Sequence, residues 1–123
     1  MTLDANILIA YLDGEEKVVV LVNRLIEEGR VVFLPAAVEI EVLSFAHWKP
    51  EEIAEVERFF EKSFVFVPID RSIVRIAAKI RRSVKVKTPD ATIAATALAT
   101  YTPLLTRNVR DFKKISSLEI QTL

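Results

Sequence analysis

The stretch TPDATIAATALATYTPLLT, residues 88–106, predicts an alanine-rich helix followed directly by a short apolar strand. Thr88, Pro89 and Asp90 suit the N-cap and the first two positions of a helix that runs to about Tyr101. A threonine side chain can cap free N–H groups, and proline is tolerated where no backbone N–H is needed. Leu104-Leu105-Thr106 is then the strand. The stretch therefore predicts a helix that leads straight into a strand.

The same alternation of strands and helices extends in both directions from this stretch. Further candidate strands are Met1–Asp4, Val31–Leu34, Phe64–Val67 and Leu118–Ile120. Phe64–Val67 is apolar throughout, which is typical of a strand buried on both faces. Apolar residues recur at helical spacing over 18–26, before Gly29, and over 73–80, after a predicted Asp70 N-cap. We therefore predict one α/β domain over residues 1–123, a three-layer α/β/α fold with a mainly parallel sheet of four to five strands.

Composition excludes several classes of function. The chain of 123 residues contains two glycines, one histidine (His47) and no cysteine. Glycine-rich phosphate loops, thiol catalysis and metal sites built from several histidines are therefore excluded. No apolar run reaches the ~20 residues of a membrane span, and the N-terminus has no basic, apolar leader. We expect a cytoplasmic protein without a membrane partner, in which carboxylates carry any chemistry.

The net charge of zero hides an unequal distribution. Residues 1–62 carry 13 acidic and six basic side chains, whereas residues 63–123 carry four acidic and 11 basic ones. Between positions 71 and 89 there are seven basic residues and no acidic one. Four of them follow helical spacing and define what we call the basic stripe: Arg71, Arg75, Lys79 and Arg82. The stripe fits a nucleic-acid-binding face, although a solvated face or a contact for an acidic partner gives the same pattern.

Four acidic residues fall where chain segments leave the predicted sheet. Asp4 ends the first strand, Glu41 lies on the helix after the second, Asp90 opens the alanine-rich helix, and Asp111 follows the strand at 104–106. Ligand sites of parallel sheets lie beyond the C-terminal strand ends, so these four carboxylates can converge there. Three of them also have simpler interpretations: Asp4 as a turn or cap residue, Asp90 as an acid favoured at the start of a helix, and Asp111 as part of a capping box with Asn108. Periodicity alone does not separate Glu41 from Glu39.

Four sequence blocks that contain these acids resemble the signature motifs of PIN domains, and most closely the VapC-type ribonuclease toxins of prokaryotic toxin–antitoxin pairs. The blocks are Leu3–Ile9, Ile40–Ser44, Pro89–Ala97 and Leu105–Phe112. The resemblance implies a metal-dependent endoribonuclease that leaves 5′-phosphate and 3′-hydroxyl ends. Its implied catalytic and metal-binding residues are Asp4, Glu41, Asp90 and Asp111, with polar support from Asn6, Thr106 and Asn108. It also implies a homodimer inhibited by an antitoxin protein.

Charge chemistry gives an independent reason for a metal. Carboxylates forced together raise one another's pKa values, and a hard divalent cation with oxygen ligands, Mg²⁺ or Mn²⁺, removes that conflict. Such an ion can activate water for phosphodiester hydrolysis without a histidine. We also expect an apolar helix over Ala36–Trp48 in which Phe45 and Trp48 are exposed as a partner surface.

Two other functions fit part of the pattern. Asp4-Ala5-Asn6 is similar to the nucleophile loop of haloacid-dehalogenase phosphohydrolases, but Asn6 stands where that chemistry usually has a second Asp, and a suitable lysine is lacking. A catalytically silent PIN-like module that binds RNA or protein would be expected to have lost one or more of the four acids. All four are present, which favours an active enzyme.

Overall fold

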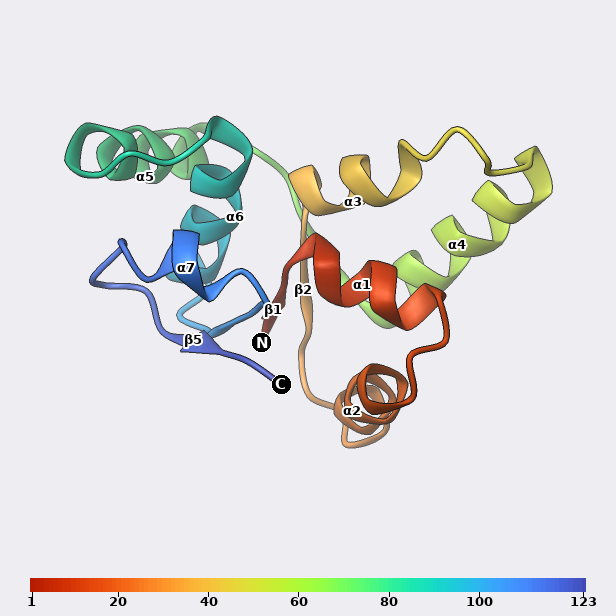
Figure 1. The fold of residues 1–123 in the computed structure, drawn as a ribbon. Helices are drawn as coiled ribbons and strands as arrows, with labels where there is room; N and C mark the ends of the chain where they lie inside the picture. Colours follow the sequence, from red (N-terminus) through yellow and green to blue (C-terminus); the bar gives the residue numbers. More distant parts are fainter.

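The computed structural model describes residues 1–123 and contains a five-stranded parallel sheet between two groups of helices (Figure 1). The strands are β1 (Thr2–Leu3), β2 (Phe33–Pro35), β3 (Val65–Val67), β4 (Leu104–Leu105) and β5 (Ile120–Gln121). Their order in the sheet is β3-β2-β1-β4-β5, and every neighbouring pair is parallel. The predicted three-layer α/β/α class is therefore confirmed.

The helices cover the sheet in two groups. They are α1 (Ala5–Leu12), α2 (Glu16–Glu27), α3 (Ala36–Leu43), α4 (Pro50–Ser63), α5 (Arg71–Ser83), α6 (Thr88–Ala99) and α7 (Val109–Phe112). The chain moves outward from β1 to β3 and then returns to β4 on the other side of β1. Right-handed crossovers consequently place α1–α4 on one side of the strands and α5–α7 on the other (Figure 1). None of these helices is long and apolar enough to cross a bilayer.

The strand order changes direction between β1 and β4, and this point fixes where the site lies. The Asp4 N–H donates to the Leu105 carbonyl at 3.0 Å, and the Thr106 N–H donates to the Gln121 carbonyl at 3.0 Å. These bonds hold the ends of β1, β4 and β5 level with one another. The crevice beyond such a switch point is the usual ligand position in a parallel sheet.

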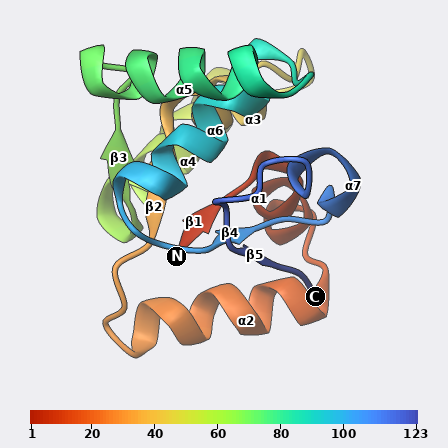
Figure 2. The same cartoon turned by 90° about the vertical axis from the view of Figure 1, so that its left-hand side faces the viewer.

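The alanines of α6 let this helix sit deep in the molecule. Ala91, Ala94, Ala95 and Ala97 have no exposed surface, and α5 lies across α6 on the side away from the sheet (Figure 2). A helix buried all round needs small side chains for its neighbours to approach. Because α6 is held on both sides, its first turn presents Asp90 at a fixed place beside the strand ends.

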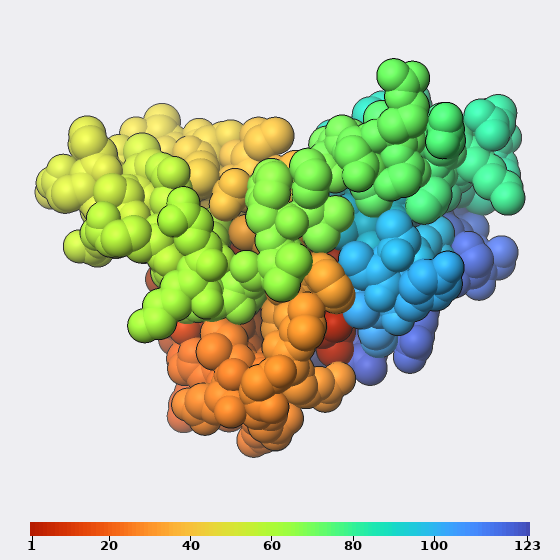
Figure 3. Space-filling model, turned by 180° about the vertical axis from the view of Figure 1, so that it is seen from behind, coloured from red at the N-terminus to blue at the C-terminus, as the bar shows by residue number.

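The prediction that Phe64–Val67 forms a strand buried on both faces is wrong. The strand, β3, is at the edge of the sheet, and the side chains of Val65 and Phe66 are 48% and 50% exposed. Figure 3 shows the green segment that contains β3 and the loop to α5 on the surface. An apolar run indicates a strand, but its position within the sheet depends on the order of all five strands.

Several predicted boundaries also differ. The second strand begins at Phe33 and the last one ends at Gln121, two residues and one residue later than predicted. The Lys87 carbonyl accepts the Ala91 N–H at 2.9 Å, so Lys87, not Thr88, is the N-cap of α6. Two predicted features are confirmed: Asp70 caps α5 by accepting the Ile73 N–H at 3.0 Å, and α2 ends just before Gly29.

The predicted helix Ala36–Trp48 is too long. Helix α3 ends at Leu43, and the Trp48 indole N–H donates to the Val42 carbonyl at 2.9 Å. A carbonyl in the last turn of a helix has no partner within the helix, so this bond satisfies one such group and turns the chain back. Trp48 is consequently half-buried, whereas Phe45 is 39% and Ile40 64% exposed.

Candidate active site

Asp4 stands at the C-terminal end of β1 and caps α1. Its Oδ1 accepts the Ala5 N–H at 2.8 Å, while its Oδ2 accepts the Thr106 hydroxyl at 2.6 Å and the Asn6 side-chain amide at 3.1 Å. The residue is 6% exposed. Burial raises the pKa of Asp4 above its ordinary value, and the three hydrogen bonds lower it in part. Its carboxylate is therefore held in one orientation and only partly relieved of its desolvation cost.

Thr106 connects the ends of β1 and β4. Besides donating to Asp4, its fully buried hydroxyl oxygen accepts the backbone N–H of Asn108 at 2.9 Å and the Asn6 amide at 3.4 Å. Thr106 and Asn6 thus contact Asp4 directly, as expected of polar support. The structure brings them together although about 100 residues separate them in the chain.

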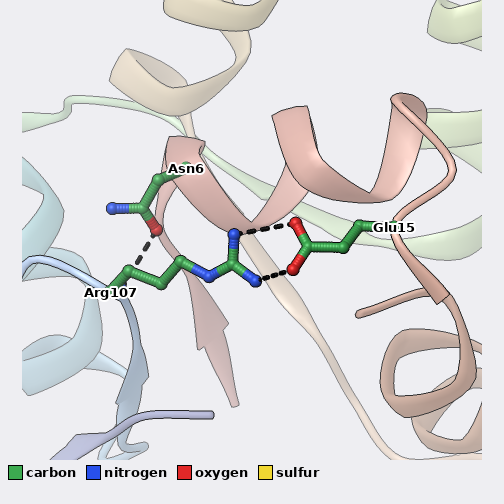
Figure 4. Close-up of polar contacts among 3 residues, drawn as sticks. All are labelled: Asn6, Glu15 and Arg107. Atoms are coloured by element: carbon green, nitrogen blue, oxygen red, sulfur yellow. Dashed lines mark hydrogen bonds and ion pairs between the residues drawn. The ribbon is translucent and has the colours of Figure 1, made fainter. Parts of the chain in front are cut away.

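An ion pair on the rim fixes the loop after β4. The Arg107 guanidinium binds both carboxylate oxygens of Glu15, and its backbone N–H donates to Asn6 Oδ1 at 3.2 Å (Figure 4). Asn6 therefore links this loop to Asp4. No sequence signal pairs Glu15 with Arg107, since they are 92 residues apart in the chain and neither belongs to a periodic pattern.

The structure separates the two glutamates of α3. Burial raises the pKa of Glu41, with further repulsion from Asp4 and Asp90. Burial also raises the pKa of Glu39, but its repelling neighbours are Glu57 and Glu61 of α4. Residues two apart on a helix differ by ~200°, so the two side chains face opposite ways. Of the two, Glu41 is the one directed to the candidate site.

Asp90 and Asp111 complete the acidic group. Burial raises the pKa of Asp90, as do Asp4 and Asp111, while Lys87 opposes the shift. The Asn108 side-chain amide donates to Asp111 Oδ2 at 3.1 Å. Asn108 is the N-cap of α7 but makes no side-chain capping bond, so the capping-box interpretation of this pair is wrong. Instead, the amide of Asn108 orients the Asp111 carboxylate.

Three of the acids line one cleft of about 540 Å³. Its lining includes Glu41, Asp90, Asp111 and Asn108, together with apolar side chains such as Ile40 and Ile69. Asp4 lies deeper, within electrostatic reach of both Glu41 and Asp90. No lysine or arginine forms an ion pair with any of the four acids, because the single ion pair of the chain joins Arg107 to Glu15.

The donor chemistry of this group suits a hard divalent cation. All candidate ligands are oxygens, and the acids repel one another with no ion pair to compensate. No set of three or more acidic or histidine side chains lies at the spacing needed to coordinate one ion. The arrangement is an open acidic group and not a closed coordination cage.

The predicted basic stripe lies outside this group. Arg71, Arg75, Lys79 and Arg82 are exposed on α5. Lys79 lines a groove of about 400 Å³ between α5, α6 and residues 114–117, and none of the four lines the acidic cleft. The structure therefore unites Asp4, Asn6, Glu41, Asp90, Thr106, Asn108 and Asp111 and leaves the stripe apart from them.

Comparisons with known proteins give a consistent family. The PIN domain family matches residues 1–118. Ribonuclease VapC19 of Mycobacterium tuberculosis is 31% identical over 122 residues, which cover 95% of each chain.

Solved structures agree with this match. A toxin–antitoxin complex from Klebsiella pneumoniae contains a chain that is 27% identical, with a TM-score of 0.75 over 95% of this chain and 93% of that one. VapBC2 from Rickettsia felis, bound to a promoter DNA fragment, has a TM-score of 0.83 at 17% identity, over 99% and 97% of the two chains. The second likeness is evidence for the fold only.

Proposed function

The chain belongs to the PIN domain family, and we propose that it is an endoribonuclease of the VapC type that hydrolyses RNA with the help of Mg²⁺ or Mn²⁺. The observation that carries the proposal is the convergence of Asp4, Glu41, Asp90 and Asp111 from four separate elements without a compensating ion pair. The family match gives no support to the haloacid-dehalogenase alternative.

The side chains of this site have distinct proposed roles. Asp4, Asp90, Asp111 and Glu41 would hold the cation, which when bound supplies an activated water and stabilises charge on the phosphate. Thr106 and Asn6 keep the Asp4 carboxylate in one orientation, and Asn108 does the same for Asp111. Loss of a supporting hydrogen bond of this kind typically costs roughly 10- to 100-fold in metal affinity or activity. The expected products carry 5′-phosphate and 3′-hydroxyl ends.

Cation dependence tests this function directly. RNA cleavage should appear when Mg²⁺ or Mn²⁺ is added and disappear in EDTA, and the cation should raise the melting temperature because it relieves repulsion among the acids. The measurements are gel analysis of a single-stranded RNA and thermal denaturation. Cleavage that persists in EDTA would contradict the proposal.

The raised pKa values fix how pH should act. Folding raises the pKa of such an acid above its value in the unfolded chain, which is about 4. As the pH rises from the unfolded pKa through the higher folded pKa, the acid increasingly destabilises the folded state. The cation-free melting temperature should fall across this range because of Asp4, Glu41 and Asp90. The increase in melting temperature that the cation causes should grow over the same pH range, because only ionised carboxylates bind the cation. A gain that is larger at pH 4 than at pH 7 contradicts this assignment.

We also propose an antitoxin partner and a homodimer. The 27% identical relative is part of a toxin–antitoxin complex, and Ile40 and Phe45 leave exposed apolar surface near the end of α3. Sedimentation at micromolar concentration should give twice the mass of one chain, and a stable monomer would remove the dimer. An RNA substrate and the absence of cysteine fit action in the cytoplasm.

We propose the basic stripe as an RNA contact outside the catalytic group. Arg71, Arg75, Lys79 and Arg82 are exposed and free of ion pairs, so they can neutralise phosphates of a strand that continues past the site.

A further inference from the structure

A second groove opens beside the acidic cleft. It has a volume of about 480 Å³ and shares Asp90, Asp111 and Lys87 with that cleft. Its lining residues are Arg81, Lys85, Val86, Lys87, Asp90, Asp111 and Lys114. We call it the basic groove, because four of its seven lining residues are cations and one is apolar.

Three of the cations lie within residues 81–87 and the fourth, Lys114, follows α7, and two of the four are tied to one segment. Arg81, near the end of α5, donates its Nε–H to the Val86 carbonyl at 3.1 Å. Lys114, which follows α7, donates from Nζ to the Lys85 carbonyl at 3.4 Å. Both bonds end on residues 84–87, the link between α5 and α6. Lys85 and Lys87 project from that same link, so the tertiary structure builds the groove around it.

No ion pair neutralises the four positive charges, and the two carboxylates of the lining offset only part of them, because four cations face two acids. Arg81, Lys85, Lys87 and Lys114 are exposed, and none takes part in an ion pair. Like charges gathered in one groove repel each other, and an anion that enters it relieves this repulsion. The adjoining carboxylates have the opposite effect on a phosphodiester backbone, which they repel. An RNA strand therefore needs compensating cations close to the acids.

We propose that the basic groove is a subsite for RNA backbone phosphates next to the scissile bond. The inference rests on the proposed ribonuclease function and deepens it by naming the residues that bring the strand to the acids. Arg81 and Lys114 shape the groove and present positive charge, while Lys85 and Lys87 contact phosphate. The predicted stripe on α5 is a separate set of cations, since none of Arg71, Arg75, Lys79 and Arg82 lines the groove.

The double variant Lys85→Gln/Lys87→Gln tests the subsite. These two side chains make no hydrogen bond that shapes the groove, whereas Arg81 and Lys114 do. The measurement is fluorescence anisotropy of a single-stranded RNA over a salt series in EDTA, which prevents cation-dependent cleavage. Affinity at low salt should fall by on the order of tenfold, and the slope of log affinity against log salt should fall by about 1.4, or ~0.7 per phosphate.

The matched control is Arg58→Gln/Lys62→Gln, which removes the same charge from exposed positions on α4. It should leave both affinity and slope near those of the unchanged protein. An unchanged slope in Lys85→Gln/Lys87→Gln would overturn the subsite. If Arg75→Gln/Lys79→Gln then shows the loss instead, the strand runs over the stripe and not through the groove.

Cleavage assays on the same proteins separate this proposal from the proposed function. If the unchanged protein cleaves RNA with Mg²⁺ or Mn²⁺ while the groove variant binds RNA normally, the subsite fails and the ribonuclease stands. If the groove variant loses binding but the unchanged protein cleaves nothing with either cation, the ribonuclease fails and the phosphate site stands. Absence of RNA binding by the unchanged protein contradicts both.

Discussion

Asp4→Asn and Asp90→Asn should each lower the rate of RNA cleavage by several orders of magnitude while the chain stays folded. Each change removes one negative charge from the group proposed to hold the cation. The loss should exceed the roughly 10- to 100-fold typical of residues that only orient a ligand, as Thr106 does. The measurement is the single-turnover cleavage rate with Mg²⁺ or Mn²⁺, alongside circular dichroism.

The structure indicates why these variants should fold. Asparagine is as good an N-cap as aspartate, so Asn at position 4 can still accept the Ala5 N–H. Asp90 is repelled by Asp4 and Asp111, so Asp90→Asn should raise the melting temperature measured without cation. Functional sites often contain residues that lower the stability of the fold, here because function requires like charges to lie close together.

Asp70→Asn is the matched control for these two changes. Asp70 is also a helix cap, on α5, and it does not line the acidic cleft. Its replacement by another good capping residue should leave cleavage unchanged. Full activity in Asp4→Asn or Asp90→Asn would contradict the proposed catalytic group.

The second large effect distinguishes two neighbouring glutamates. Glu41→Gln should abolish cleavage, whereas Glu39→Gln should not. Both changes remove one charge from α3 and preserve the size of the side chain. Only Glu41 is repelled by Asp4 and Asp90, while Glu39 is repelled by Glu57 and Glu61 of α4. The measurement is again the cleavage rate with cation.

Stability provides the internal control for this pair. Each glutamate has a pKa raised by burial and like charges, so either substitution should raise the cation-free melting temperature. Added cation should then raise the melting temperature of Glu39→Gln by more than it raises that of Glu41→Gln. Loss of cleavage in Glu39→Gln alone would mean that α3 turns its opposite face toward Asp4 and Asp90.

Local signals in the amino-acid sequence were enough to predict the class of the fold. Helical periodicity, apolar strand segments and the proline and aspartate near helix starts are local, because hydrogen bonds within a few residues and burial of one face produce them. They were sufficient for the alternation of strands and helices and for the parallel sheet. Resemblance of four sequence blocks to PIN domains supplied Asp4, Glu41, Asp90 and Asp111 as candidates, and the PIN domain family matches residues 1–118, a range that includes all four blocks.

Features that depend on contacts between distant segments required the three-dimensional structure. Strand order put β3 at an exposed edge, which its apolar sequence could not reveal. The rotation of α3 directed Glu41, and not Glu39, to the acids, because periodicity fixes the angle between two side chains but not the face that meets the sheet. The Arg107–Glu15 pair and the basic groove join residues from different elements. Electrostatic and packing energies of this kind depend on distance in space, which a linear sequence does not contain.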